Sequence, residues 1–412
     1  MSMMTPLPQR DAYDVMTRKL RYPSSETLRK ILELAMSLEE AQLMVEMPGT
    51  IDALAAKVSR SPKVVADQVE RMFFAGLIAE TPGPDGSLTY TLPGYHYCIE
   101  IASDNMMWAF GGNQVPKSGQ ITTQDLWEHL DEKSHQICDL WNTFFYEEWY
   151  RWERPDELVH RRMAQLGGAQ AGRSFGMMPA IRALEKSEVL GTEILHPWDL
   201  REFARRGEHG LYTRVCTCRT RARGCDFPVW VCGTIFDGMP GRDVNAEVKA
   251  DRRGQLHKYA GDEWLELMIL AEEDRMMVHM GGAWMNGCNC CRDCCNWLNP
   301  LRMYTEPWEG VHPSPYRAVV NSDVCEGCTK DCMPRCAFNV IKAAKNPSTE
   351  KVRADIDPDK CVGCGQCVVG CNVEGAIRLE LAEAAGAFVP VMGGRAKLPD
   401  MPGFKPDIPR KN

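Results

Sequence analysis

Two stretches decide the fold of the C-terminal region, Cys325-Glu-Gly-Cys328-Thr-Lys-Asp-Cys332-Met-Pro-Arg-Cys336 and Cys361-Val-Gly-Cys364-Gly-Gln-Cys367-Val-Val-Gly-Cys371. Each contains four cysteines, and thiolates a few residues apart on one tight loop have the reach to bind three corners of an iron–sulfur cubane. Gly327, Gly363 and Gly365 suit loops that wrap closely round such a group, since glycine tolerates positive φ. The spacing predicts two [4Fe-4S] clusters.

The second run has the spacing Cys-x2-Cys-x2-Cys-x3-Cys, and over roughly residues 316–382 the chain resembles the two-[4Fe-4S] ferredoxin family. The resemblance implies that the last cysteine of each run binds the other run's cluster. The ligands are then Cys325, Cys328, Cys332 and Cys371 for cluster 1, and Cys361, Cys364, Cys367 and Cys336 for cluster 2. The first run departs from the family, with three residues, Thr329 to Asp331, where two are usual. Ala337 and Asn372 replace the usual proline. Zinc, which Cys-x2-Cys pairs also bind, is the alternative.

Length and composition set the broad class of the protein. A chain of 412 residues predicts two to four domains, and 44% hydrophobic with 25% charged residues is ordinary for a soluble globular protein. No apolar run approaches the ~18 residues that span a bilayer, and no apolar signal segment begins the chain. A net charge of −8 argues against nucleic acid as the main partner. Nineteen cysteines clustered at ligand spacing predict metal sites in a reducing cytoplasm.

The N-terminal quarter predicts a loose arm over residues 1–23 and a compact domain over 24–94. A helix over 28–35, a helix capped by Thr50, a helix beginning at Ser61-Pro62 and a hairpin turning at 82–86 resemble a winged-helix domain. Such domains often bind DNA through the third helix. Here Lys63 and Arg71 are balanced by Asp67 and Glu70, so the charge pattern favours docking to protein, within the chain or to a partner.

The middle domain, residues 95–315, is predicted to be a mixed helical domain with two cysteine-rich motifs, and its first part, residues 95–165, is predicted to be helical. Large aromatic side chains between 127 and 152 predict a core, and Cys98 and Cys138 are expected to be core thiols. Glycines between 167 and 176 predict a flexible or closely approached segment. No phosphate-binding glycine motif supports a nucleotide or flavin site. A Gly/Pro-rich tail over residues 383–412 is expected to wrap the protein or a partner.

The first motif in the middle domain combines Cys216, Cys218, Cys225 and Cys232 with Arg214, Arg219, Arg221 and Arg223. Four cysteines in this span predict ligands of one metal or cluster, and buried small thiols are the alternative. The arginines stabilise thiolates or bind an anionic substrate or partner.

The second motif contains Cys288, Cys290, Cys291, Cys294 and Cys295. Adjacent cysteines cannot all point the same way, so three or four are expected to face one site. A third centre, iron–sulfur or zinc, could come from this run, from the first motif or from both. A helix is predicted over residues 262–279, and its last residue, His279, is either a proton donor or an ordinary helix-end histidine.

The whole arrangement resembles a family of anaerobe dicluster iron–sulfur proteins with a winged-helix start, a Cys-x-Cys-Arg segment, a Cys-Asn-Cys-Cys run and a C-terminal ferredoxin unit. The resemblance implies electron transfer to a redox partner protein in anaerobic metabolism. We therefore expect an α+β, multidomain electron carrier, with a homo-oligomer left open. One alternative is a reductase whose own metal centre lies among the middle cysteines, with Arg219 or His279 as catalytic candidates and Arg214, Arg221 and Arg223 binding substrate. Another is a redox-responsive winged-helix regulator.

Overall fold

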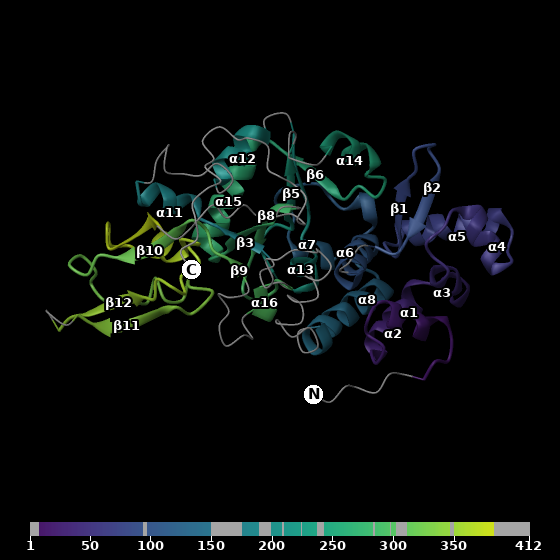
Figure 1. Ribbon diagram of the computed structural model, residues 1–412, viewed down its shortest axis with the longest axis horizontal. Coiled ribbons are helices and arrows are strands. Elements are labelled where there is room, and N and C mark those ends of the chain that lie inside the picture. The colour runs from purple at the N-terminus through teal and green to yellow at the C-terminus, as the bar shows by residue number, and fades with distance from the viewer. Residues whose placement is uncertain are drawn as a thin grey trace, which may run out of the picture. The chain divides into compact units, whose positions relative to one another are not determined.

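The computed structural model describes residues 8–93, 97–149, 175–188, 199–207, 210–223, 225–236, 243–282, 285–296, 298–301, 311–346 and 350–382. Within these ranges helices are mixed with strands, and the strands form separate sheets, three of two strands and one of seven, as expected for an α+β chain (Figure 1). The chain divides into two compact units, which are described in turn: residues 1–152, 215–230 and 251–255, and the remainder. The predicted glycine segment up to Gly172 and the tail over 383–412 lie outside the described residues.

The first unit is mainly helical. Its elements are α1 (Ala12–Lys19), α2 (Glu26–Ala35), α3 (Leu38–Val45), α4 (Ile51–Val58), α5 (Pro62–Phe74), β1 (Ala79–Pro82), β2 (Leu88–Thr91), α6 (Tyr97–Ala109), η1 (Gly112–Gln114), α7 (Thr123–Trp127), α8 (Glu132–Thr143), the π-helix η2 (Phe144–Trp149) and α13 (Thr217–Arg221). The antiparallel pair β1–β2 is the predicted hairpin.

The prediction of a loose arm is wrong for residues 12–19, which form α1. Met16 and Asp14 are fully buried there, and Asp14 forms ion pairs with Arg10 (3.0 Å) and Arg29 (2.9 Å). Burial raises the pKa of Asp14, but hydrogen bonds from Arg10 and the charge of Arg29 outweigh it and leave the pKa well below its usual range. The buried carboxylate of Asp14 and its two arginine partners hold this helix in place, although the helix has few apolar residues.

Local signals for the next helices are confirmed. Thr50 caps α4 by accepting the N–H of Ala53, and Ser61 caps α5 by accepting that of Val64. The helix α3 was not predicted; it begins with a capping box between Ser37 and Glu40. The helix is short and its apolar stripe is narrow, so its capping residues were the stronger signal.

The aromatic residues between 127 and 149 form a core, as predicted. Trp141, Phe144 and Phe145 are fully buried, and their rings contact one another edge-on or stacked. The indole N–H of Trp141 donates to Asn105 (3.1 Å), which itself donates to the carbonyl of Ala75 (3.0 Å). Cys98 and Cys138 are buried thiols, as expected.

The second unit is built on a seven-stranded sheet in the order β6-β4-β5-β8-β7-β3-β9. Its strands are β3 (Phe175–Met178), β4 (Leu211–Val215), β5 (Trp230–Phe236), β6 (Leu256–Tyr259), β7 (Val278–Gly282), β8 (Met285–Cys290) and β9 (Val311–His312). The helices are α11 (Ile181–Lys186), α12 (Leu200–Arg206), α14 (Val244–Ala250), α15 (Gly261–Arg275), α16 (Leu298–Leu301) and α17 (Gln366–Gly370). In this part of the predicted mixed helical middle domain the helices are accompanied by a seven-stranded sheet, which the sequence pattern did not indicate.

Two further strand pairs complete this unit. The first strand after the sheet, β10 (Tyr316–Val320), pairs antiparallel with the last, β13 (Ile377–Leu381). The two strands between them, β11 (Ile341–Lys345) and β12 (Val352–Ile356), pair with each other, and Figure 1 shows them next to β10. Each cysteine run connects one pair to the other, because the first lies between β10 and β11 and the second between β12 and β13.

Candidate metal centres

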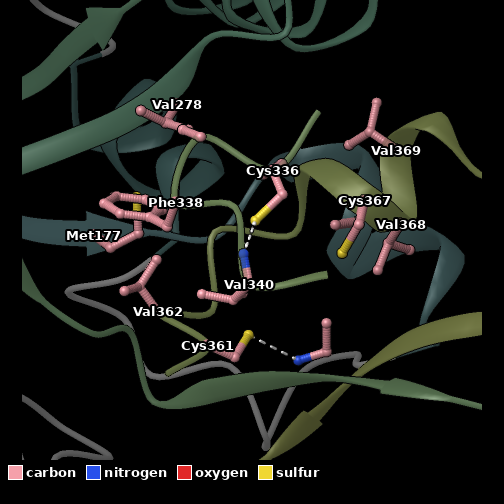
Figure 2. Packing of buried hydrophobic residues seen from close by; sticks show 14 of the residues in the cluster. Met177, Val278, Cys336, Phe338, Val340, Cys361, Val362, Cys367, Val368 and Val369 are labelled. Atoms are coloured by element: carbon pink, nitrogen blue, oxygen red, sulfur yellow. Dashed lines mark hydrogen bonds between the residues drawn. The ribbon is translucent and has the colours of Figure 1, made fainter. Parts of the chain in front are cut away.

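Seven of the eight cysteines in the two C-terminal runs belong to one buried cluster of the second unit or pack against it, and the exception is Cys328. Cys332, Cys336, Cys361 and Cys367 are buried, whereas Cys328 is exposed. Figure 2 shows Cys336, Cys361 and Cys367 among Val340, Val362, Val368 and other apolar side chains. The cluster gives the thiols low-dielectric surroundings, with Cys328 nearest to solvent.

The thiols raise one another's pKa mainly within two groups. Burial and the thiols of Cys328 and Cys371 raise the pKa of Cys332 to about 11. Burial also raises the pKa of Cys371, and the thiols of Cys328 and Cys325 raise it further. Cys371, from the second run, therefore lies among the first three cysteines of the first run.

The second group behaves in the same way. Burial raises the pKa of Cys364, with Cys336 and Cys361 raising it further. Burial raises the pKa of Cys367 well above that of an ordinary thiol, and the thiols of Cys364, Cys361, Cys336 and Cys332 raise it further. Cys336 thus lies among the first three cysteines of the second run. Both groups have the membership that the sequence analysis assigned to the clusters, and ligation itself stays a prediction.

Backbone N–H groups already donate to three of the sulfur atoms. Val340 donates to Cys336 (3.4 Å) and Ala318 to Cys361 (3.5 Å), the two dashed contacts in Figure 2. Ala354 donates to Cys325 (3.4 Å). Such donors stabilise negative charge on sulfur, and hydrogen bonds to sulfur are one means by which proteins set a cluster's reduction potential. The donor set therefore fits a thiolate-ligated cluster.

Two glycines bring the cysteine loops close to the strands. Gly327 has φ +71°, and a Cβ there would lie 2.0 Å from the carbonyl oxygen of Val352 on β12. Gly363 has φ +70°, and a Cβ there would lie 2.2 Å from the carbonyl oxygen of Tyr316 on β10. Only glycine satisfies both the conformation and the space at these positions.

The C-terminal end of α15 anchors both cysteine runs. Arg335, which precedes Cys336, donates to the carbonyls of Glu272 (2.8 Å) and Glu273 (2.7 Å), a favourable place for a cation at a helix end. Gln366, which precedes Cys367, is fully buried and donates to the carbonyl of Met277 (2.6 Å). Sequence reasoning missed both anchors, although each stands next to a cysteine of the motif.

The nine cysteines of the two middle-domain motifs do not belong to one unit. Cys216, Cys218 and Cys225 lie in the first unit, and Cys232 lies in the second with the run from Cys288 to Cys295. Within the second unit, the Sγ atoms of Cys232 and Cys288 are 3.5 Å apart.

Three of the four arginines of the first motif lie in the first unit and contact residues there. Arg219 is fully buried, donates to the carbonyl of Pro228 (2.8 Å) and lies over the ring of Phe227. Arg221 is also fully buried and donates to Asn142 (2.8 Å). Arg223 is exposed and lies 4.9 Å from the ring centroid of Trp127.

Arg214 lies on β4, partly buried. The structure therefore uses Arg219 and Arg221 to hold α13 to neighbouring helices and loops, and a substrate-binding role for the four arginines stays a prediction.

His279 lies on a strand, so the expectation of a helix-end histidine is wrong. The helix α15 ends at Arg275 because Met276 adopts a left-handed conformation, and β7 begins at Val278. Nε2 of His279 is 2.7 Å from Glu272, and Nδ1 is 2.5 Å from Oδ1 of Asn289. Both ring nitrogens are engaged in buried contacts, and a proton-donor role stays a prediction.

Glu272 was not singled out from the sequence. It accepts the backbone N–H groups of Ile181 (2.6 Å) and Arg182 (3.0 Å) in addition to His279, and it is fully buried. It stands four residues after Met268, on the apolar stripe of α15, and an acidic residue in that stripe was the available signal.

Within the described ranges, no three His, Cys, Asp or Glu side chains converge closely enough to hold a single metal ion. A cubane differs from a single ion in that its four ligands surround a larger body, one at each iron. None of the helices that the structure describes combines the length and hydrophobicity needed to cross a membrane. No family model, curated protein or solved structure matched the chain.

Proposed function

We propose that the protein is an iron–sulfur electron carrier whose C-terminal region, residues 316–382, is a ferredoxin-like domain with two [4Fe-4S] clusters. Cys325, Cys328, Cys332 and Cys371 hold cluster 1, and Cys361, Cys364, Cys367 and Cys336 hold cluster 2. The observation that carries the proposal is the division of the eight thiols into these two groups, each completed by the distant run. The pairing of β10 with β13 and of β11 with β12 supports it, because it brings the two runs together.

The clusters supply one-electron chemistry, and the chain's own groups prepare their surroundings. Backbone N–H groups donate to Cys325, Cys336 and Cys361 and stabilise negative charge on sulfur. Apolar side chains limit access of water at cluster 2. The exposure of Cys328 supports cluster 1 as the place where electrons pass to or from a partner protein.

We propose that the N-terminal region is a winged-helix-like domain that docks onto other segments of its own unit rather than onto DNA. Arg252 forms ion pairs with Glu70 on α5 (2.6 Å) and Glu80 on β1 (2.8 Å). The guanidinium of Arg253 lies 4.0 Å from the ring centroid of Phe73. Arg71, one of the two cations on this helix, is paired with Glu40. These contacts occupy charges that DNA binding would need, and so they favour docking.

The test uses full-length protein purified without oxygen, with iron and acid-labile sulfide measured per chain. Reduction by dithionite is expected to produce the electron paramagnetic resonance (EPR) signal of two magnetically coupled [4Fe-4S]⁺ clusters. The reduced protein should return about two electrons per chain from these clusters to an oxidised viologen dye.

The Cys364→Ser variant should lose cluster 2 and the magnetic coupling between clusters. The matched control is Cys98→Ala, a buried cysteine outside both groups, which should keep the wild-type iron content and spectrum. Unchanged iron content and spectrum in Cys364→Ser would refute the proposed ligand set. Zinc in place of iron in the wild-type protein would refute the electron-carrier function.

A further inference from the structure

Two thiols of the middle domain lie against each other across neighbouring strands of the second unit. Cys232 lies on β5 and Cys288 on β8, and their Sγ atoms are 3.5 Å apart. The two strands are antiparallel, with Thr234 paired to Asn286. Each cysteine is two residues from its strand's member of that pair, in opposite chain directions, so continuation of the alignment places the two cysteines opposite each other. The sulfur contact therefore follows from the pairing of the strands.

A side chain next to Cys288 holds this alignment. Asn289 donates from its amide to the carbonyl of Val231 on β5 (2.8 Å), and its Oδ1 lies 2.5 Å from Nδ1 of His279 on β7. Adjacent residues of a strand point to opposite faces, so Asn289 makes these contacts on the face away from the Cys288 thiol. The two contacts tie β8 to both of its neighbouring strands and thereby fix the position of Cys288 relative to β5.

The strand geometry suits a covalent bond between the two sulfur atoms. Residues directly opposite each other in antiparallel strands have Cα atoms about 4.5 or 5.5 Å apart, depending on the type of pair. A disulfide spans about 4.4 to 6.8 Å between Cα atoms, so either type of pair lies within its range. The sulfur atoms would have to approach from 3.5 Å to about 2 Å, which small rotations about the two Cα–Cβ bonds provide. A disulfide can therefore form without movement of the backbone.

A second thiol, that of Cys290, also contacts Cys288 through a side-chain hydrogen bond, but it lies on the same strand. Residues two positions apart on a strand are separated by about 6.8 Å between Cα atoms, which is the upper limit for a disulfide. Their side chains leave the strand side by side and do not point toward each other. Cys232, across the strand pair, is therefore the better bonding partner of Cys288.

The two thiols differ in their access to solvent. Cys232 is partly buried, whereas Cys288 is 4% exposed. The backbone N–H of Gly233 donates to the sulfur of Cys288, and such a donor stabilises negative charge on sulfur. A dissolved reagent can therefore meet Cys232 first, while Cys288 is held ready beside it as the second nucleophile.

We propose that Cys232 and Cys288 are a reversible modification site, which forms an intramolecular disulfide by exchange with low-molecular-weight disulfides. The sulfur of Cys232 gives up its proton, attacks one sulfur of the small disulfide and forms a mixed disulfide, releasing one small thiol. The sulfur of Cys288 then gives up its proton, attacks the Cys232 sulfur and releases the second small thiol. Two protein thiols are oxidised and one small disulfide is reduced to two thiols, which take up the two protons.

Small thiols reverse the reaction by the same two steps. The bond joins β5 to β8, and thus the β6-β4-β5 side of the sheet to the β8-β7-β3-β9 side. The site involves none of the eight C-terminal cysteines and does not depend on the proposed function.

The experiment exposes full-length protein, purified without oxygen, to graded ratios of oxidised to reduced glutathione. The samples are quenched with acid, denatured and alkylated, mass spectrometry counts the alkylated cysteines, and iron per chain is measured in parallel. The wild-type protein should lose two alkylatable cysteines in one step as the ratio rises, with its iron content unchanged. Fragmentation of the peptides should locate the link between Cys232 and Cys288. Cys138→Ala, which replaces a buried cysteine outside the pair, is the control and should lose the same two cysteines.

Three variants separate the roles of the two thiols. Cys288→Ser should stop at the mixed disulfide and carry one glutathione on Cys232, whereas Cys232→Ser should carry none on the buried Cys288. Cys290→Ser should still form the link.

The proposal is overturned if the wild-type protein keeps all its alkylatable cysteines at every ratio, or if the link maps to any other pair, Cys288 with Cys290 included. It is equally overturned if Cys290→Ser loses the link or if Cys288→Ser takes up no glutathione at Cys232. The mapping uses the wild-type protein, so it decides the matter even if a variant fails to fold.

Discussion

The carboxylate of Glu272 lies 2.7 Å from Nε2 of His279, and both side chains are completely buried. Nδ1 of the same ring lies 2.5 Å from Asn289, whose amide nitrogen donates to Val231, so an oxygen faces the ring. Both ring nitrogens therefore lie within hydrogen-bond distance of buried oxygen atoms. Glu272 also accepts two N–H groups at the start of α11, and it thereby joins α11, α15 and β7 through one buried carboxyl group.

Replacing Glu272 by glutamine should destabilise the second unit. The amide keeps the shape, but its N–H₂ group replaces one of the two oxygens that accept from Ile181, Arg182 and the region of His279. Leaving a buried donor without its acceptor costs about 1–3 kcal/mol. We expect a clearly lower thermal unfolding midpoint in protein kept under anaerobic conditions. Glu273→Gln is the control, because that neighbouring side chain is 46% exposed and its pair with Arg182 contributes about 1 kcal/mol or less. Equal midpoints for the two variants would contradict this role of Glu272.

Gly327→Ala should remove cluster 1, while Gly375→Ala should not. Both glycines have φ +71°, so alanine costs roughly 1–2 kcal/mol of backbone strain at either position. Only at Gly327 would the added Cβ also meet the oxygen of Val352, at 2.0 Å, whereas Gly375 has no atom within 4 Å. The iron content should fall by about four per chain in Gly327→Ala alone. Full iron content in that variant would show that the loop can move away from β12.

Lys186→Met should lower the reduction potential of cluster 1. The ammonium group of Lys186 donates to the carbonyls of Val369 (2.8 Å) and Cys371 (3.2 Å), and a cation there favours the more negative, reduced cluster. An exposed charge interaction of about 1 kcal/mol or less corresponds to tens of millivolts at most for a one-electron couple. Potentiometric titration followed by EPR measures the shift. Lys345→Met, an exposed lysine on β11 paired with Glu350, is the control and should leave the potential unchanged. A rise in potential in Lys186→Met would contradict the assignment of Cys371 to cluster 1.

Cys138→Ala should make stability less sensitive to alkaline pH. Burial raises the pKa of Cys138 from 9.0 to about 12, so the folded state holds the proton after the unfolded chain has released it. This contribution is fully present below pH 9 and is lost as the pH rises toward 12, by up to about 1.4 kcal/mol per pH unit. Thermal melts of wild type and variant from pH 8 to 11 measure the difference. The variant should be less stable by roughly 1 kcal/mol at pH 8, and the gap should shrink or reverse as the pH rises. A constant gap would show that Cys138 does not titrate in this range.

Local sequence signals predicted best where the stabilising contacts are themselves local. The caps at Thr50 and Ser61 lie three residues from the N–H groups that they accept, and both were predicted correctly. The helix α1 was missed because its buried charge at Asp14 is balanced partly by Arg29, which belongs to a different helix. Likewise, His279 was placed at a helix end because its apolar neighbours continue the helical pattern, whereas the left-handed residue Met276 ends the helix earlier.

The sequence by itself determined which eight cysteines form the two C-terminal groups. The loops that carry them are short, and a cluster requires ligands at a spacing that the order of residues already contains. It did not determine which of the nine middle cysteines belong together. That depended on the pairing of β5 with β8, which brings Cys232 within 3.5 Å of Cys288 across 56 positions of chain, and on the division into units that assigns Cys216, Cys218 and Cys225 elsewhere. Strand alignment results from packing over long sequence separations, so only the tertiary structure could bring these two thiols together.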